Sequence, residues 1–293
     1  MLRVGYGSEQ CSLNEPITNS HCDWTLGLNQ AVIGTVVYDG LLIRVAGVHM
    51  AKEPAVKYPR RRVIRWVLRF LTGTLVRILG RYKVEGLENI PMTGPVIIAA
   101  NHFHFVDPPL LLASAPRQIE FVAGAVRPNA PGWTNIFPNL WGFIPAFRGG
   151  YSRSTLSSAR EVLDQGGVLG IFPEGGSWAK FLRPARPGTA YIAALSGAPI
   201  VPVSIVGGPE LLGKGRAVVR VVFHPPLDAP IITTKGPARR TEIDAFGETL
   251  MEAISSELPD ARKGRYAEDP AVRAEALSMS EFPWDEQDEL RGS

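Results

Sequence analysis

The chain has 293 residues, of which 45% are hydrophobic and 20% charged, so it can bury the core of one large or two small domains. Its formal net charge of +3 is too small to indicate a nucleic-acid-binding protein. Two cysteines exclude a disulfide framework, and no apolar run approaches the ~18 residues of a spanning helix. We therefore expect a reducing, cytoplasmic setting, with neither secretion nor a membrane span.

The first 49 residues differ in character from the rest. The run 36–43 predicts a small hairpin around an Asp39-Gly40 turn, whereas the residues before it are polar and show no period. We treat residues 1–56 as an N-terminal extension. The alternative interpretation is that translation begins at Met50, which would make the preceding residues a start-site artefact.

The segment 57–84 contains a predicted basic amphipathic helix. Between residues 61 and 81, apolar side chains recur at intervals of three and four: Val63, Trp66, Val67, Phe70, Leu71, Leu75, Ile78 and Leu79. Four arginines lie opposite them: Arg61, Arg65, Arg69 and Arg77. Such a helix can lie apolar face down in a lipid headgroup layer or pack that face on a protein core. We favour the membrane surface, because arginines are dense here and acidic partners are absent.

Residues 85–258 alternate short apolar runs with helical stretches, which predicts an α/β domain with a mixed central sheet covered by helices. The expected strands are 96–100, 119–123, 143–147, 168–172, 200–205 and 218–223. The expected helices are 110–115, 155–165, 189–195 and 243–258. Pro259 ends the last of these, and we expect the polar tail 259–293 to be mobile or loosely docked.

The turn from Asn101 to Asp107 joins a predicted strand to a predicted helix, which is where open α/β sheets bind ligands. A carboxylate at Asp107 could hold one ring nitrogen of His102, so that the other nitrogen takes a proton from an attacking hydroxyl. Three alternatives remain open from these residues alone. Asp107 could be a helix N-cap, His102 a core histidine, or both could join His104 as zinc ligands, although no further histidine completes that site.

Two further stretches carry candidate binding residues. An apolar strand breaks at Phe172-Pro173-Glu174-Gly175-Gly176, where glycine amides could receive an anion. A second strand ends at Phe147-Arg148, and arginine suits a phosphate because it is always charged and binds in a bidentate manner. The alternatives are an ordinary strand-to-loop turn and a surface arginine.

In their order and spacing these stretches resemble the glycerolipid acyltransferase superfamily, which includes the 1-acylglycerol-3-phosphate (lysophosphatidate) acyltransferases. The first matching block is Asn101, His102 and Asp107, and the second is Phe147-Arg148. The third block is Phe-Pro-Glu-Gly at 172–175, and the fourth is the apolar stretch 198–203 with its two prolines. The similarity covers roughly residues 86–223.

The resemblance implies acyl transfer from acyl-CoA or acyl-carrier protein to a lysophospholipid hydroxyl, without a cofactor or metal. His102 would be the general base and Asp107 would orient it. The implied substrate-binding residues are Asn101, Phe147, Arg148, Phe172, Pro173, Glu174, Gly175 and Gly176. The implied place of action is the cytoplasmic face of the membrane, with the protein peripheral or monotopic. The alternatives are another acceptor, such as glycerol-3-phosphate or another lysolipid, and a catalytically silent lipid-binding homologue.

The chain departs from the family pattern at one place. After Phe-Pro-Glu-Gly the family usually continues Thr-Arg-Ser, whereas this chain reads Gly176-Ser177-Trp178. Either Lys180, Arg183 or Arg186 supplies the missing positive charge, or the acceptor is not a plain phosphate monoester. The alternative interpretation of these three side chains is that they are solvated loop charges. The departure bears on the identity of the substrate more than on the type of reaction.

Overall fold

The computed structural model describes residues 31–38, 41–48, 56–124, 136–146, 153–176, 179–213 and 215–279. The chain divides into two compact units, Met1–Glu53 and Pro54–Ser293. In the first unit, β1 (Ala31–Tyr38) pairs antiparallel with β2 (Leu41–Val48). The strands of the predicted hairpin are therefore confirmed, while its Asp39-Gly40 turn lies outside the described residues.

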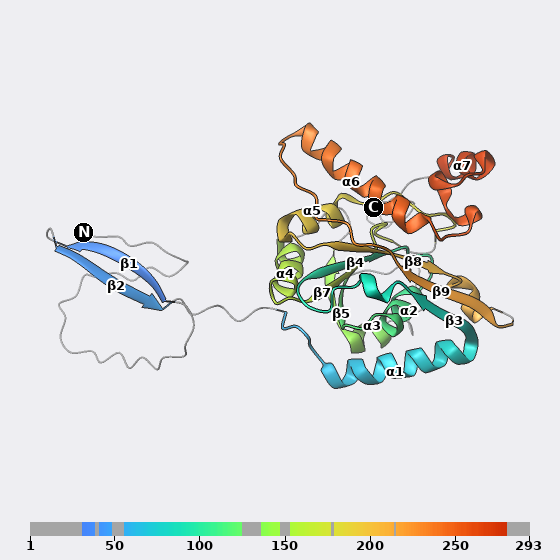
Figure 1. The fold of residues 1–293 in the computed structure, drawn as a ribbon, viewed down its shortest axis with the longest axis horizontal. Helices are drawn as coiled ribbons and strands as arrows, with labels where there is room; N and C mark the ends of the chain where they lie inside the picture. Colours follow the sequence, from blue (N-terminus) through green and yellow to red (C-terminus); the bar gives the residue numbers. More distant parts are fainter. Residues whose placement is uncertain are drawn as a thin grey trace, which may run out of the picture. The chain divides into compact units, whose positions relative to one another are not determined.

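The second unit is built on a seven-stranded mixed sheet in the order β3-β9-β8-β4-β7-β5-β6 (Figure 1). Strands β4 to β8 are mutually parallel where they pair, β9 is antiparallel to β8, and β3 is parallel to β9. The strands are β3 (Gly80–Glu85), β4 (Val96–Ala100), β5 (Ile119–Gly124), β6 (Phe143–Ala146), β7 (Val168–Ile171), β8 (Ile200–Val206) and β9 (Ala217–Phe223). The predicted α/β class and six of these strands are confirmed, each strand end within one residue.

Helices cover both faces of this sheet, because successive side chains of β4 are buried alternately in two apolar clusters. Ile97 and Ala99 belong to one apolar cluster, whereas Ile98 and Ala100 belong to the other. In Figure 1, α4 (Arg153–Asp164), α5 (Pro187–Ser196) and α6 (Pro237–Ser255) cover one face. The other face carries α1 (Arg62–Leu79), α2 (Asp107–Ser114) and α3 (Ile136–Trp141). A strand buried on both sides is a continuous apolar run, as 96–100 is.

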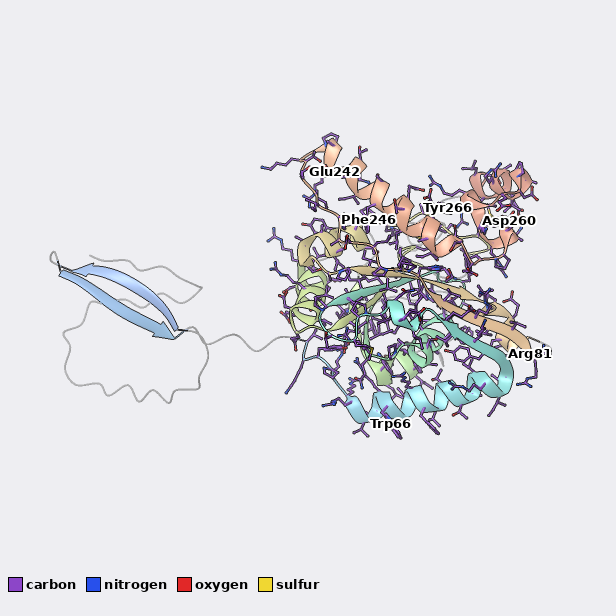
Figure 2. The ribbon with its side chains drawn as sticks, in the orientation of Figure 1. Trp66, Arg81, Glu242, Phe246, Asp260 and Tyr266 are labelled. Carbon is purple, nitrogen blue, oxygen red and sulfur yellow. The ribbon has the colours of Figure 1, made fainter. Side chains whose placement is uncertain are left out.

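The segment after Pro259, which we predicted to be mobile or loosely docked, contains regular structure in its described part. As far as Leu277 it forms η4 (Asp260–Arg262), η5 (Gly264–Tyr266) and α7 (Pro270–Leu277). The carboxylate of Asp260, labelled in Figure 2, accepts the backbone N–H groups of Glu268 and Asp269 at 2.7 and 3.0 Å. Polar caps of this kind order the segment, and hydropathy carries no signal for them. Residues 280–293 lie outside the described part of the chain.

Helix α1 forms as predicted, but the face that it buries is the opposite of the one expected for a core helix. Arg65 is fully buried, whereas eight apolar side chains of the helix are exposed. These form the outer face of α1: Val63, Ile64, Trp66, Val67, Phe70, Leu71, Leu75 and Ile78. Trp66, labelled in Figure 2, is 67% exposed. Its ring stacks on that of Phe70 with the centroids 6.0 Å apart. The interpretation that α1 packs its apolar face on the core is therefore wrong.

Buried electrostatics explain this orientation. Arg65 forms a bidentate ion pair with Glu120 of β5, and the Nη2 to Oε2 distance is 2.8 Å. Both side chains are fully buried, and Arg60 Nε lies 2.8 Å from the same carboxylate. Arg65 Nε also donates to Trp141 O, at the end of α3. The prediction that acidic partners are absent was wrong, because the partner lies 55 residues away in sequence.

Within the described residues, no helix combines the length and the apolar character that crossing a bilayer requires.

Candidate active site

Three loops meet at the carboxyl edge of the sheet, which we define as the edge where the parallel strands β7, β4 and β8 end. β4 lies between the other two strands. The turn 101–107 follows β4, the loop 172–176 follows β7, and residues 207–213 follow β8. The topology therefore brings the first and third sequence blocks together at the ligand-binding edge of an α/β sheet.

His102 and Asp107 form the predicted pair. His102 Nδ1 lies 3.2 Å from Asp107 Oδ2, and the same oxygen accepts the backbone N–H of His104 at 2.6 Å. A carboxylate can only accept, so this contact places the proton on Nδ1 and leaves Nε2 as the acceptor. The His102 ring stacks on Phe172 with centroids 4.2 Å apart, which fixes its plane. Its side chain is 16% exposed, whereas that of Asp107 is 1% exposed.

The two structural alternatives for this pair are resolved by the same geometry. Asp107 is the first residue of α2, whose N-cap position is held by Val106. The Asp107 carboxylate accepts from the turn before the helix, so it is not an N-cap side chain. Nor is His102 enclosed in the core, since part of its ring is exposed. The described residues contain no group of three histidines, cysteines or carboxylates arranged to hold a metal ion.

Asn101, which we predicted to bind substrate, instead hydrogen-bonds to the backbone of β8. Its side chain is fully buried. Oδ1 accepts the N–H of Ile205 at 2.7 Å, and Nδ2 donates to the carbonyl of Ile205 at 2.9 Å. Asn101 thus continues the pairing of β4 with β8 into the turn, which fixes the backbone one residue before His102.

Glu174 is also engaged by the protein itself. Its side chain is fully buried, Oε1 accepts the backbone N–H of His102 at 2.7 Å, and Oε2 accepts that of Arg183 at 3.0 Å. One carboxyl group therefore ties the His102 turn to the loop after β7 and to the segment that precedes α5. We assign it to positioning His102, because no part of it is left to contact a substrate.

The remaining predicted residues separate into two groups. Phe172 contacts His102, the Pro173 carbonyl accepts the N–H of Arg186 at 2.8 Å, and Gly175 and Gly176 continue the same loop. Phe147 and Arg148 follow β6 in the sequence and lie outside the described residues. That strand is outermost in the sheet, separated from β4 by β5 and β7. The roles of Phe147 and Arg148 therefore stay predictions.

The comparisons with known proteins agree with this geometry. Residues 81–206, from β3 to the end of β8, match the family model described as Acyltransferase. A 1-acyl-sn-glycerol-3-phosphate acyltransferase of Bacillus subtilis is 28% identical over 165 residues, which cover 52% of this chain and 77% of that protein. Residues 81–206 are therefore similar to proteins of the glycerolipid acyltransferase superfamily.

Two other similar proteins carry related names. The chloroplastic 1-acyl-sn-glycerol-3-phosphate acyltransferase BAT2 of Brassica napus is 26% identical over 180 residues, covering 57% of this chain. The match spans only about half, 51%, of that relative's own length. The crystal structure of PlsC, the 1-acyl-sn-glycerophosphate (LPA) acyltransferase of Thermotoga maritima, is 27% identical with a TM-score of 0.45. It covers 67% of this chain and 83% of that chain. Helix α1 and everything after β8 lie outside the residues that match the Acyltransferase model.

Gly208, which lies just beyond the residues that match the Acyltransferase model, bears directly on the pair of His102 and Asp107. A Cβ atom at Gly208 would lie 2.3 Å from Asp107 Oδ1, which is buried and has no hydrogen-bond partner among the described residues. We expect Gly208→Ala to displace the carboxylate and to lower acyl transfer about 100-fold, since a 1 Å misplacement can cost that much. Steady-state rates measured beside Gly213→Ala, in the same loop, would check this. Equal rates for the two variants would contradict the prediction.

The buried carboxyl of Glu174 predicts a pH dependence of stability. Burial raises its pKa to about 8, against the opposing effect of the two N–H donors. Between the ordinary pKa of about 4.3 and this value, the folded protein keeps a proton that the unfolded chain releases. The stabilising contribution of the protonated Glu174 carboxyl to the free energy of unfolding is therefore complete at low pH and is lost as the pH rises towards 8.

We expect the difference in unfolding free energy between wild type and Glu174→Gln to narrow as the pH rises from about 4.3 to about 8. Urea denaturation at several pH values would measure it, with Glu88→Gln, an exposed glutamate, as the control for net charge. A difference that stays constant with pH would refute the prediction.

Proposed function

We propose that this protein transfers a fatty acyl chain from acyl-CoA or acyl-carrier protein to the free hydroxyl of lysophosphatidate, which forms phosphatidate. The observation that carries the proposal is the 3.2 Å contact between His102 Nδ1 and Asp107 Oδ2, at the carboxyl end of β4 within the residues that match the Acyltransferase model. The printed names of the similar proteins from Bacillus and Brassica support lysophosphatidate as the acceptor.

In the proposed reaction, His102 Nε2 takes the proton of the acceptor hydroxyl as its oxygen attacks the thioester carbonyl. The tetrahedral intermediate collapses with cleavage of the carbon–sulfur bond, and the imidazolium returns the proton to the departing thiolate. Asp107 stabilises the imidazolium and keeps Nδ1 protonated throughout. The nucleophile belongs to the substrate, so no acyl-enzyme forms and no nucleophilic serine is required.

Transfer of a labelled acyl chain from acyl-CoA to lysophosphatidate in liposomes tests the proposal. We expect labelled phosphatidate as the product. Labelling of glycerol-3-phosphate or of another lysolipid in its place would show a different acceptor. Binding of lysolipids without any transfer would favour a silent lipid-binding protein, and it would refute the enzymatic proposal.

The outer face of α1 supports action at a membrane surface. β3 begins directly after α1, and Gly80 pairs with Ala217 at the start of β9. Because β9 is antiparallel to β8, that start lies beside the end of β8, at the carboxyl edge. The exposed apolar face of α1 therefore extends towards the edge that carries His102. We infer that α1 lies in the headgroup layer of the cytoplasmic face, apolar side down, with the acceptor close to the site.

This orientation predicts that a double substitution releases the protein from lipid. Trp66→Ser with Phe70→Ser removes two large exposed side chains, each worth about 1.5–3 kcal/mol when fully buried. We therefore expect liposome partitioning to fall at least about 100-fold. Flotation beside Leu277→Ser, which alters an exposed apolar residue of α7, would measure the effect. Undiminished flotation of the double variant would count against the membrane role of α1.

A further inference from the structure

The segment 259–277 lies beyond the residues that match the Acyltransferase model, yet it packs against the chain that follows β7. The backbone N–H of Leu182 donates to the carbonyl of Arg262, at the end of η4, at 2.8 Å. A Cβ atom at Gly264 would lie 2.7 Å from the carbonyl oxygen of Leu182, and Gly264 has a φ of +62° that favours glycine. The two backbones are therefore in close contact.

This contact leads through the backbone to the candidate general base. Arg183, the residue after Leu182, donates its N–H to Glu174 Oε2 at 3.0 Å. The other oxygen of that carboxyl accepts the N–H of His102 at 2.7 Å. The backbone that Arg262 holds is therefore the one that fixes the carboxyl group positioning His102.

The side chain of Arg262 contacts all three parts of the chain that meet at the carboxyl edge. Its Nη1 donates to the carbonyl of Lys180, in the chain after β7, at 3.2 Å. Its Nη2 lies 3.4 Å from Oε1 of Glu210, in the loop after β8. Its Cζ lies over the ring of Phe103, 5.7 Å from the centroid, and Phe103 follows His102 directly in the turn after β4. One guanidinium group thus joins three segments that are distant in sequence.

The chemistry of these partners suits an arginine. A cation over an aromatic face is attracted by the electrons of the ring, and the planar fork of arginine can donate to several acceptors at once. Phe103 is 5% exposed, so its ring is held in the core, whereas the Arg262 side chain is 33% exposed. A shift of one loop would either break its contact with Arg262 or move the guanidinium group away from the other two loops.

The loop after β8, which carries Glu210, also borders Asp107. The same loop contains Gly208, where a Cβ atom would come within 2.3 Å of Asp107 Oδ1. Burial lowers the pKa of the His104 ring, and the nearby Glu210 carboxylate is among the charges that oppose this shift. By holding Glu210, Arg262 therefore also holds the loop that lies against the carboxylate of the pair.

We propose that Arg262 is a positioning residue, which holds the three loops of the candidate site together so that His102 and Asp107 keep the geometry that acyl transfer needs. The inference rests on the proposed acyl transfer. It assigns a role in the reaction to the chain after α6, which lies beyond the residues that match the Acyltransferase model. In this role Arg262 contacts neither substrate, and it acts through Phe103 and through the backbone that leads to Glu174.

Steady-state kinetics of Arg262→Met provide the first test, because methionine keeps an apolar stem and removes the charge and the donors. We expect kcat to fall about 10- to 100-fold, since a misplacement of 1 Å can cost the larger of these factors. The KM values for lysophosphatidate and acyl-CoA are expected to change little. Arg265→Met is the matched control, because Arg265 also lies over an aromatic ring, that of Tyr266, and also pairs with a glutamate, Glu248 of α6. It should leave kcat unchanged.

Hydrogen–deuterium exchange provides a second test, which does not depend on turnover. The backbone N–H groups of His102 and His104 are held by the carboxylates of Glu174 and Asp107. In Arg262→Met, we expect amides of the turn 101–107 to exchange at least about 10-fold faster, because the loops open locally more often. Amides of β7, and all amides in Arg265→Met, should exchange as in wild type.

Four outcomes would overturn this role. The first is a wild-type kcat in a folded Arg262→Met variant. The second is a rise in the KM for either substrate at constant kcat, which would make Arg262 a binding residue. The third is an equal loss of kcat in Arg265→Met, which would trace the effect to general packing. If Arg262→Met fails to fold, Arg262→Lys keeps the charge without the planar fork, and wild-type kcat and exchange in that variant are the fourth.

The two tests together separate this inference from the proposed reaction. Faster exchange of the turn 101–107 in Arg262→Met, beside a wild type that transfers no acyl chain, would support the bridge between the loops and refute the reaction. Acyl transfer by a wild type whose kcat and exchange Arg262→Met leaves unchanged would support the reaction and refute the positioning role.

Discussion

His102→Ala is expected to lower the rate of acyl transfer to lysophosphatidate by about 10²–10⁴-fold, the range that general-base catalysis contributes. The ring nitrogen that would accept the hydroxyl proton is lost, while the backbone N–H that Glu174 holds is kept. We therefore expect kcat to fall with little change in the KM for the acceptor, which a labelled acyl-transfer assay would measure.

Two companion variants make this prediction specific. Asp107→Asn keeps the shape of the side chain, but its amide can donate to Nδ1 and so move the ring proton to Nε2, which blocks the base. A loss comparable to that of His102→Ala is expected. His104→Ala changes a histidine of the same turn whose contact with Asp107 is made by the backbone, and a much smaller loss is expected. Full activity in both dyad variants would exclude the mechanism.

Glu120→Ala is expected to lower the free energy of unfolding by about 3–5 kcal/mol, because it leaves the buried guanidinium of Arg65 without a partner. Arg60 loses the same carboxylate, and α1 loses its buried ion pair with β5. Chemical denaturation would measure the change.

A surface pair of the same chemistry provides the control for this effect. Glu85 and Arg220 are each about one-third exposed, and Glu85→Ala should lower the free energy of unfolding far less than Glu120→Ala, because water screens the surface pair. The double variant Arg65→Met with Glu120→Leu should recover most of the stability, since apolar residues often replace a buried ion pair without loss. Equal destabilisation by Glu120→Ala and Glu85→Ala would contradict this account.

The parts of the fold that could be predicted are those encoded by local patterns. β4 and β7 are uninterrupted apolar runs, and the structure confirms them at the predicted positions. β3 was not predicted because it follows α1 directly and alternates exposed Arg81 and Lys83 with half-buried residues. The exposed apolar face of α1 agrees with the interpretation favoured from its dense arginines, but the Arg65–Glu120 ion pair beneath it was beyond local reasoning, because Glu120 lies on another strand.

In the candidate site, too, local sequence patterns predicted some features and missed others. His102 and Asp107 lie five residues apart, and the motif around Glu174 is contiguous, so their types and spacing were informative. Their supporting contacts were not predicted, because the atoms involved are distant in sequence. Asn101 pairs with Ile205 across 104 residues, and Glu174 meets His102 across 72. Gly208 matters only for the space that it leaves beside Asp107, and a composition pattern does not encode such space.

The ion pair beneath α1 also limits how this protein can be engineered. Deleting the helix to obtain a detergent-free preparation would remove Arg65 and leave the Glu120 carboxylate enclosed in apolar surroundings, at a cost in stability. A better route keeps the helix and replaces its outward side chains, such as Trp66, Phe70 and Ile78, with polar ones. The same helix would then serve as a scaffold element in solution while its inward arginines continue to anchor it.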